Sequence, residues 1–285
     1  MLILNAVAFS KVRGQADSKF NNRSHRKIAV IDGVIGYTGG VNIADEYVNA
    51  IERFWHWKDG GIRLEGDAVC ELTRLFLTDF AINVKNFEVV QSVVYPKTDS
   101  SGDGFIIPFG DGPRPIYRYN VSKLAIQNML SCALDYAYIF TPYLIIDNEL
   151  CKTIETTALR GVKVKIVVPH VADKRLIFSI TRSFYRRLME AGVEIYEYTP
   201  GFIHAKAYLV DGEFAIVGTV NLDYRSLVHH FENGVWMYRT ECIKDIVSDM
   251  ENTIEQSEKV GENTQKPSIF EKLVRCVVRI FSPLL

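Results

Sequence analysis

The sequence contains one polar pattern twice, H-x-K-x4-D-x6-G-x2-N, and this repeat constrains the fold more strongly than any other feature. The copies begin at His25 and His204, and the offset between them, 204 minus 25, is 179 residues. The same offset relates the other matching pairs, which are Lys27 and Lys206, Asp32 and Asp211, Gly39 and Gly218, and Asn42 and Asn221. One register kept over all these positions indicates an internal duplication, and a duplicated chain of 285 residues predicts two similar lobes.

Helical and strand patterns alternate between the two copies of the motif. The predicted helices cover residues 117–133, 147–161 and 175–192, and the predicted strands cover residues 136–142, 162–169 and 193–198. Asp147 is expected to cap the second helix, and Gly161 and Gly192 are expected to end the second and third. Such alternation predicts α/β layers around a mostly parallel sheet.

The expected junction between the lobes is the segment DSSGDGFIIPFGDGPRP at residues 99–115, which is rich in glycine, proline and aspartate. We assign residues 1–110 to a first lobe, 111–262 to a second and 263–285 to a C-terminal amphipathic helix. Only 24 residues precede His25, whereas residues 118–203 precede His204 in its lobe. The predicted fold class is therefore α/β and bilobal, with two similar mixed-sheet lobes, an active site at their interface and an incomplete first lobe with an unpaired sheet edge.

Composition narrows the classes of partner. The net charge of -1 gives no overall attraction to nucleic acid or anionic lipid, so any anion site must be local. The five cysteines show no C-x-x-C spacing and suggest neither a disulfide framework nor a zinc site. The sequence SIFEKLVRCVVRIFSPLL at residues 268–285 has one apolar and one basic helical face, which suits a membrane interface or packing on the body of the protein.

The doubled motif has the residue types needed for phosphate chemistry. His and Lys at positions i and i+2 of a strand share one face, so two copies meeting between the lobes place two imidazoles and two ammonium groups around one cavity. The lysines would offset the charge of a phosphate, Asn42 and Asn221 would donate hydrogen bonds to its oxygens, and Gly39 and Gly218 suit a close backbone approach. One histidine would attack phosphorus and the other would protonate the leaving alkoxide.

Supporting residues are less constrained by the pattern. Glu232 is a candidate carboxylate for holding the tautomer of His204. Asp32 and Asp211 either assist the catalytic groups or form hairpin turns, since each is followed by glycine. The remaining histidines, His56, His170, His229 and His230, lie outside the duplicated pattern and are expected to be structural.

The doubled motif, together with NNRSHRKIAVIDGVIGYTGGVNIADEY, AGVEIYEYTPGFIHAKAYLVD and GTVNLDYRS, resembles the phospholipase D superfamily and within it the bacterial cardiolipin synthases. The resemblance implies transfer of a phosphatidyl group between two phosphatidylglycerols, with His25 as nucleophile, His204 as acid and base, and phosphate bound by the motif lysines and asparagines. It implies no metal or other cofactor. The partners would be phosphatidylglycerol and anionic membrane lipid, without nucleic acid, and the location the cytoplasmic face of a bacterial membrane, reached peripherally through the C-terminal helix.

Two other functions fit the same residues. The first is another phosphodiesterase activity of this superfamily, in which the chain would hydrolyse phospholipid or act on nucleic acid. Binding of nucleic acid would need a basic groove, which the near-neutral net charge does not favour. A lipid-binding protein without turnover would result if the shortened first lobe failed to position His25, because a displacement of about 1 Å costs roughly 100-fold in rate.

Overall fold

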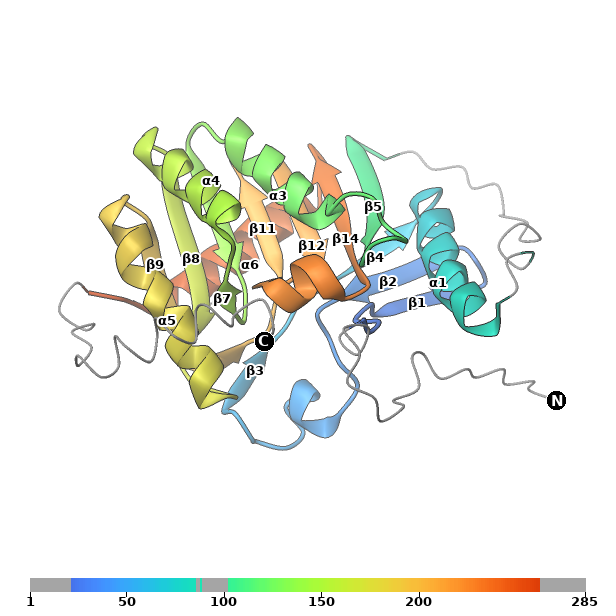
Figure 1. Cartoon of the computed structure of the whole chain (residues 1–285), viewed down its shortest axis with the longest axis horizontal. Helices are drawn as coiled ribbons and strands as arrows, with labels where there is room; N and C mark the ends of the chain where they lie inside the picture. Colours follow the sequence, from blue (N-terminus) through green and yellow to red (C-terminus); the bar gives the residue numbers. More distant parts are fainter. Residues whose placement is uncertain (1–21, 86–87, 89–101, 262–285) are drawn as a thin grey trace.

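The computed structural model describes residues 22–85, 88 and 102–261, and an eight-stranded sheet dominates this part of the chain (Figure 1). The strand order is β15-β9-β8-β6-β11-β12-β14-β5. The bounds are β5 Phe105–Asp111, β6 Tyr136–Phe140, β8 Lys163–Pro169, β9 Glu194–Tyr198, β11 Ala207–Val210, β12 Phe214–Gly218, β14 Glu232–Tyr238 and β15 Ser257–Lys259. Two short parallel ladders lie beside this sheet, β10 Gly201–Ile203 with β3 His56–Lys58 and β13 Leu222–Asp223 with β7 Leu144–Ile145.

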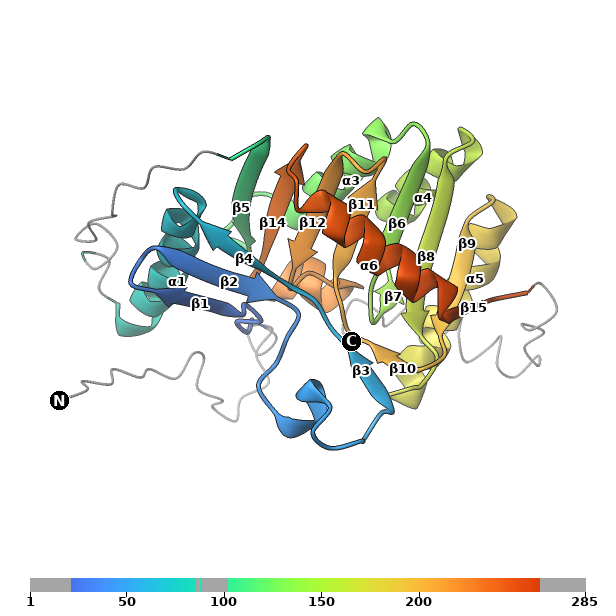
Figure 2. The same ribbon diagram turned by 180° about the vertical axis from the view of Figure 1, so that it is seen from behind.

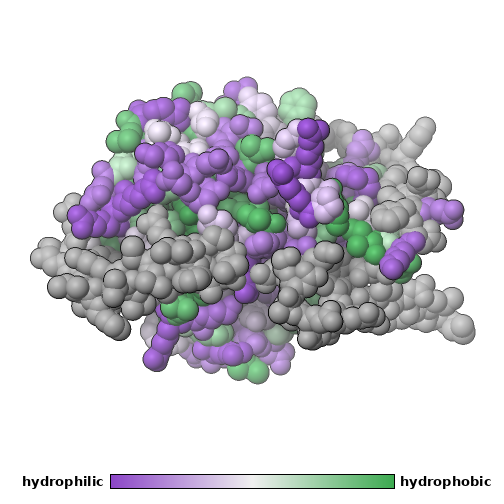
Figure 3. Space-filling model, viewed as in Figure 1, coloured by the Kyte–Doolittle hydropathy of each residue, from purple (hydrophilic) through white to green (hydrophobic). Residues whose placement is uncertain are grey.

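Helices cover both faces of the large sheet. Figure 1 shows α3 Val121–Cys132, α4 Asn148–Leu159 and α5 Arg175–Glu190 on one face, and Figure 2 shows α6 Ile243–Glu255 crossing the other. One hydrophobic core joins the sheet to α3, α4 and α5. A second lies between the sheet and α6, and it reaches Leu64, Val69 and Leu72 in the segment that follows the first motif. In Figure 3 hydrophilic side chains cover much of the outer surface of α3 and α4.

The helices and strands predicted between the two motifs are present with small shifts at their ends, so the α/β fold class is confirmed. The side chain of Asp147 accepts a hydrogen bond from Leu150 N at 2.8 Å, the expected N-cap of α4. Gly161 and Gly192 both have φ of 96°, the left-handed conformation that ends a helix.

The expectation of a mostly parallel sheet is wrong. Only the β6-β8 and β8-β9 ladders of the eight-stranded sheet are parallel. The ladders β11-β12, β12-β14 and β14-β5 are antiparallel, as is the pairing of β6 with β11. The motif itself causes this change, because its strand-turn-strand forms an antiparallel hairpin that is added to the edge of the βαβ units.

The two motif copies fold alike. In the first copy β1 Ile28–Ile31 pairs with β2 Ile35–Gly39, and the second copy repeats these bounds in β11 and β12 at the offset of 179 residues. A third antiparallel strand follows in each, β4 Gly61–Glu65 beside β2 and β14 beside β12, and then a helix, α1 Ala68–Val84 or α6. The described sheet of the first unit has three strands, in the order β1-β2-β4.

The two units are joined through the start of the first motif. Ser24 forms a parallel bridge with Phe231, and the parallel β3-β10 ladder ties the segment after the first motif to the segment before His204. The predicted junction at residues 99–115 contains β5, which adds to β14 at the edge of the large sheet. The division at residue 110 therefore passes through a strand and stays a prediction.

One prediction falls outside this description. The C-terminal amphipathic helix at residues 263–285 lies among residues that the structure does not describe. Over the ranges that are described, none of the helices has the length and apolar character that crossing a bilayer requires.

Candidate active site

Each motif histidine is held by backbone from the other motif unit. His25 lies just before β1, and its N–H donates to Phe231 O at 2.9 Å. His204 lies between β10 and β11, and its N–H donates to Lys58 O at 2.6 Å. These bonds fix the backbone of both histidines at the contact between the two units, which we call the seam. The polar faces of the two hairpins meet there.

Each motif histidine contacts a carboxylate of the other unit, an arrangement that we call the exchange of carboxylates. His25 Nδ1 lies 3.0 Å from both carboxylate oxygens of Glu232, which belongs to the second unit. His204 Nδ1 lies 2.7 Å from Asp59 Oδ2, which belongs to the first. The assignment of Glu232 to His204 is therefore wrong, because the hairpins face each other across the seam and each carboxylate reaches the opposite histidine.

Asp59 was missed as a site residue, although the sequence contains a signal for it. Gly40 N–H donates to Gly60 O and Thr219 N–H donates to Asn233 O, both at 2.9 Å. The pair Asp59-Gly60 therefore occupies the position of Glu232-Asn233 in the other copy. The matching sequences are DGG at residues 59–61 and ENG at residues 232–234, where the third strand of each unit begins. The first was overlooked because an Asp-Gly pair is typical of a turn.

Glu232 is a fully buried anion. Ser226 Oγ donates to its Oε1 at 2.6 Å, and Thr219 Oγ1 donates to its Oε2. Burial alone would raise the pKa of Glu232, but the charge of His25, the nearby imidazole of His230 and hydrogen bonds from His25 and Ser226 outweigh it and lower the pKa. In the neutral form of His25, an ionised carboxylate at this place favours the tautomer with its proton on Nδ1, which leaves the lone pair on Nε2.

The two motif lysines lie in the same electrostatic environment. Burial lowers the pKa of Lys27 to about 8, against the opposing charges of Glu232 and Asp59. Burial also lowers the pKa of Lys206 to about 7, and the cation of Lys27 lowers it further. Each ammonium group donates to the carbonyl oxygen of the histidine two residues before it, Lys27 to His25 O at 2.8 Å and Lys206 to His204 O. Both lysines therefore lie beside the motif histidines, and an anion bound next to them would raise their pKa values.

His204 has an imidazole pKa well below its ordinary value. Its burial lowers the pKa of the imidazole to about 4, the cation of Lys206 acts in the same direction, and the hydrogen bond with Asp59 opposes both. Lys206 Nζ lies 2.8 Å from His204 Nδ1. An anion bound beside these cations would raise the pKa of His204, because it offsets the positive potential that keeps the imidazole unprotonated.

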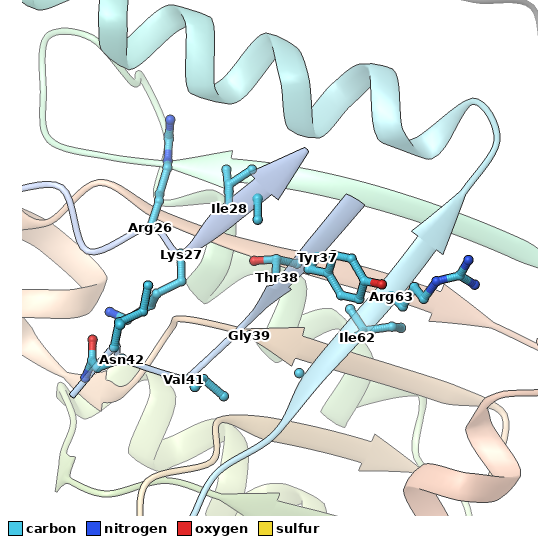
Figure 4. Close-up of a pocket in the computed structure, with 13 residues that line it drawn as sticks. Arg26, Lys27, Ile28, Tyr37, Thr38, Gly39, Val41, Asn42, Ile62 and Arg63 are labelled. Carbon is cyan, nitrogen blue, oxygen red and sulfur yellow. The ribbon is translucent and has the colours of Figure 1, made fainter. Parts of the chain in front are cut away.

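The motif asparagines approach the site differently. Asn221 is buried, its Nδ2 donates to Asp223 Oδ2 at 3.1 Å, and its Oδ1 has no hydrogen-bond partner within the described residues. Asn42 lines a pocket of about 710 Å³ together with Lys27, Tyr37 and Arg63. Figure 4 shows Lys27 and Asn42 at one end of this pocket, and Tyr37 and Arg63 toward the other. The pocket thus opens from the polar end of the first motif along the β1-β2-β4 sheet.

The motif glycines lie where two strands approach closely, as the pattern indicates. A Cβ on Gly39 would be 2.4 Å from Gly60 O, and one on Gly218 would be 2.3 Å from Asn233 O. Side chains at these positions would push apart the strands that hold Asp59 and Glu232.

Both motif aspartates occupy hairpin turns. Asp32 and Asp211 have positive φ angles of 54° and 53°, and each is followed by a glycine with positive φ. The carboxylate of Asp211 accepts hydrogen bonds from the backbone N–H groups of Leu134, Asp135 and Tyr136 at 2.8 to 2.9 Å. These contacts favour the turn-forming role over the catalytic one, since they place Asp211 at the far end of β11 from His204.

Of the other histidines, His56 lies in β3 of the first unit, and His170 and His230 lie in the second unit. His56 Nδ1 lies 2.8 Å from the Tyr198 hydroxyl and His170 Nδ1 lies 3.1 Å from Glu197 Oε2, both outside the cluster. His230, in contrast, lies within it, with Nδ1 3.5 Å from Glu232 Oε1. The site therefore contains a third imidazole that the repeat did not predict.

The chain is similar to known proteins over most of its length. Residues 126–255 match a family model described as "Cardiolipin synthase, PLD-like domain". A Streptococcus mutans protein called "Uncharacterized protein" is 42% identical over 99% of this chain and 61% of its own length. A "Cardiolipin synthase" of Alkalihalophilus pseudofirmus is 37% identical over 93% of this chain and 53% of its own length. The chain thus spans between half and two thirds of the length of these relatives.

The fold has a counterpart among solved structures. The crystal structure of a phosphatidylserine synthase from Haemophilus influenzae superposes with a TM-score of 0.69 and 15% sequence identity, over 92% of this chain and 71% of that one. At this level of identity the likeness describes the fold alone.

Proposed function

This chain belongs to the phospholipase D superfamily, with cardiolipin synthases among its relatives, and from that premise we propose that it transfers a phosphatidyl group between two phosphatidylglycerols. The products would be cardiolipin and glycerol. The observation that carries the proposal is the exchange of carboxylates, in which Glu232 holds His25 and Asp59 holds His204. Two imidazoles oriented in this way beside two buried lysines suit attack on a phosphodiester and protonation of its leaving group.

In the first half of the reaction His25 is the nucleophile. Its Nε2 lone pair forms a bond to phosphorus, the bond from phosphorus to the glycerol oxygen breaks, and His204 gives its proton to that oxygen. Glu232 stabilises the charge that develops on the His25 ring, as the carboxylate of a catalytic triad does. The product is a phosphatidyl group on His25 and free glycerol.

In the second half His204 acts as a base. It removes the proton from a hydroxyl of the second phosphatidylglycerol, whose oxygen attacks phosphorus and displaces His25. The net result is one cardiolipin for each glycerol, with both histidines returned to their first state. Lys27, Lys206, Asn42 and Asn221 bind the phosphate oxygens in this proposal, Gly39 and Gly218 keep the strands close, and Asp32 and Asp211 form turns.

The proton on His204 would arrive with the substrate. Burial lowers the pKa of this imidazole to about 4, so it is neutral at pH 7. A bound phosphodiester anion offsets the cations of Lys206 and Lys27 and raises the pKa. Protonation coupled to substrate binding therefore gives His204 the acid form only when there is a leaving group to protonate.

The test is incubation of the purified chain, and of its His25→Ala variant, with phosphatidylglycerol vesicles while cardiolipin and glycerol are both measured. The proposal predicts equal amounts of both products from the unchanged chain and none from the variant. Phosphatidic acid in place of cardiolipin would indicate a hydrolase. No product from either protein would contradict transfer by this chain.

A second substrate separates the roles of the two histidines. A phosphatidyl ester of p-nitrophenol has a leaving group that needs no proton. We expect His204→Ala to release one equivalent of nitrophenol in a burst, since His25 still attacks, whereas His25→Ala should release none. A burst from His25→Ala alone would reverse the assignment.

A further inference from the structure

His230 adds a third metal-ligating side chain to a pair that the proposed reaction already uses. It follows the helical turn Arg225–His229, and its N–H donates to Arg225 O at 2.8 Å. Its ring centroid lies 5.6 Å from that of His25. The Nδ1 atom is buried and has no hydrogen-bond partner among the residues that the structure describes, with Glu232 Oε1 3.5 Å away.

The three side chains have the spacing of a metal site. His25 Nδ1 lies 3.0 Å from Glu232 Oε1, and the ligand atoms of His25, His230 and Glu232 all lie within 4.8 Å of one another. Zinc binds histidine nitrogen and carboxylate oxygen at roughly 2.0 to 2.2 Å, so ligands at the corners of a tetrahedron around it are about 3.3 Å apart. Two of the three separations are within about 0.3 Å of that value.

We propose that His25, His230 and Glu232 form a zinc-binding site and that zinc bound there switches the active site off. Two imidazoles and one carboxylate leave a fourth position for water, as in zinc sites with three protein ligands. Glu232 is prepared for this role, because Ser226 and Thr219 orient its carboxylate through hydrogen bonds and such outer contacts fix ligand geometry. The metal acts here as an inhibitor, outside the transfer reaction.

Inhibition follows from the tautomer of His25. Its Nδ1 faces Glu232, so the opposite nitrogen, Nε2, is the one available to attack phosphorus. A zinc ion bound to Nδ1 takes the lone pair of that nitrogen, and the single ring proton moves through solvent to Nε2. The proton count of the neutral imidazole is unchanged, but Nε2 no longer has a lone pair and forms no bond to phosphorus. This consequence depends on the proposed function, whereas binding of the metal does not.

The binding test uses the whole chain after removal of metal with a chelator. Cobalt(II), a spectroscopic substitute for zinc, is titrated in, and zinc affinity is then measured by competition with a coloured chelator. We expect one equivalent bound, with a cobalt spectrum of nitrogen and oxygen ligands and without the strong near-ultraviolet band of thiolate. His230→Asn and His230→Gln should each weaken binding by about 100-fold or more, because loss of an outer-shell contact alone costs 10- to 100-fold.

The matched control is His170→Asn, which removes an imidazole that pairs with the single carboxylate of Glu197 at 3.1 Å. It should leave the affinity unchanged. Circular dichroism before titration shows whether each variant is folded. Equal affinity of the unchanged chain and both folded His230 variants, or a thiolate spectrum, would overturn the site.

The inhibition test measures cardiolipin formation with zinc added and then removed by chelator. We expect a reversible loss of activity at one equivalent of zinc in the unchanged chain, and at least a 100-fold higher zinc requirement in His230→Asn. Full turnover by the zinc-loaded chain would contradict inhibition by zinc but would not contradict zinc binding. A chain that binds zinc through His230 but makes no product without zinc would contradict the proposed function and keep the metal site.

Discussion

At the scale of single residues, the exchange of carboxylates explains how the site is held. His25 lies 207 residues from the carboxylate it contacts and His204 lies 145 residues from its own. Each imidazole therefore takes its carboxylate contact from the other motif unit. The first histidine has its backbone and its side chain fixed by residues of the second unit, so the size of the first lobe does not by itself decide whether His25 is in place.

Removal of the Asp59 carboxylate tests its role as a positioning residue. Asp59→Asn should lower kcat by about 10²- to 10⁴-fold with little change in KM, as loss of a tautomer-holding aspartate does. Asp59 raises the pKa of His204, so the variant should lose the acid form at lower pH and its activity should decline earlier as pH rises. Asp249→Asn, which removes a half-exposed carboxylate bonded to Lys58, is the control. An unchanged pH profile would contradict the assignment.

Lys206 should make stability depend on pH. Its pKa is about 7 in the folded chain against 10.5 ordinarily, so the unfolded chain binds more protons between these values. The free energy of unfolding should therefore rise as pH increases from about 7 to about 10.5, by an amount on the order of several kcal/mol for this one group. Below pH 7 both states are protonated and the contribution is constant.

Denaturant unfolding of the unchanged chain and of Lys206→Met at several pH values measures this effect. The difference between the two proteins isolates Lys206 from the other groups that titrate at high pH. We expect the rise to be smaller in the variant. Parallel curves over the whole range would show that Lys206 keeps an ordinary pKa.

At the scale of elements, the hairpin is the unit that is repeated, and its glycine determines how closely the next strand approaches. The β2-β4 and β12-β14 ladders pair Gly39 with Gly61 and Gly218 with Gly234. The residue two positions before the second glycine of each pair is the carboxylate that crosses to the other unit, Asp59 or Glu232. Close packing of glycine on glycine therefore places the acid beside the seam.

The same elements differ in what covers them. Tyr37 of β2 lines the pocket and is 41% exposed, whereas its counterpart Ile216 of β12 is buried in the core beneath α3 and α4. The pocket of Figure 4 thus lies on the face of the β1-β2-β4 sheet that corresponds to the helix-covered face of the second unit.

A methyl group at Gly218 should disturb both stability and activity. Its Cβ would lie 2.3 Å from Asn233 O and 2.6 Å from Gly234 Cα, so β12 and β14 must separate and Glu232 must move. We expect Gly218→Ala to lower the free energy of unfolding by about 1–3 kcal/mol, the usual cost of overpacking, and to reduce turnover further than stability alone explains. Gly102→Ala, where nothing lies within 4 Å, is the control. Equal effects of the two substitutions would contradict the packing argument.

At the scale of the whole molecule, the buried Arg26 side chain connects several elements. Its guanidinium donates to Asp79 Oδ1 of α1 at 2.8 Å, to Glu232 O of β14 at 3.0 Å and to the Tyr117 hydroxyl at 2.7 Å. Because it follows His25 directly, this residue links the position of the nucleophile to the packing of α1 on the rest of the chain.

Loss of this guanidinium should cost more than loss of an ordinary surface ion pair. Arg26→Met should lower the free energy of unfolding by about 3–5 kcal/mol, because it leaves a partly buried Asp79 without its cation. The double variant Arg26→Met with Asp79→Leu should recover part of this loss, and a double-mutant cycle by denaturant unfolding measures the coupling. The exposed pair Arg239 and Glu213 provides the matched control cycle, with a coupling of about 1 kcal/mol or less. Additive effects at Arg26 and Asp79 would exclude the link.

Local patterns in the sequence were sufficient for the α/β class, the helices and strands between the motifs, and the duplicated hairpin. Periodicity, the cap at Asp147 and the turn glycines Gly161 and Gly192 depend on near neighbours and can be recognised from the residues alone. The placement of His and Lys on one strand face follows from the same rule. These features need no knowledge of what the elements pack against.

Only the tertiary structure decided which groups meet. Glu232 was assigned to the histidine of its own unit and in fact holds His25, while Asp59 resembled a turn residue and in fact holds His204. Three backbone amides contact Asp211, and His230 joins the cluster, through folding of chain distant in sequence. The physical reason is common to all of them: a repeat defines each half of the site, but the orientation of one half against the other is set by packing across the seam.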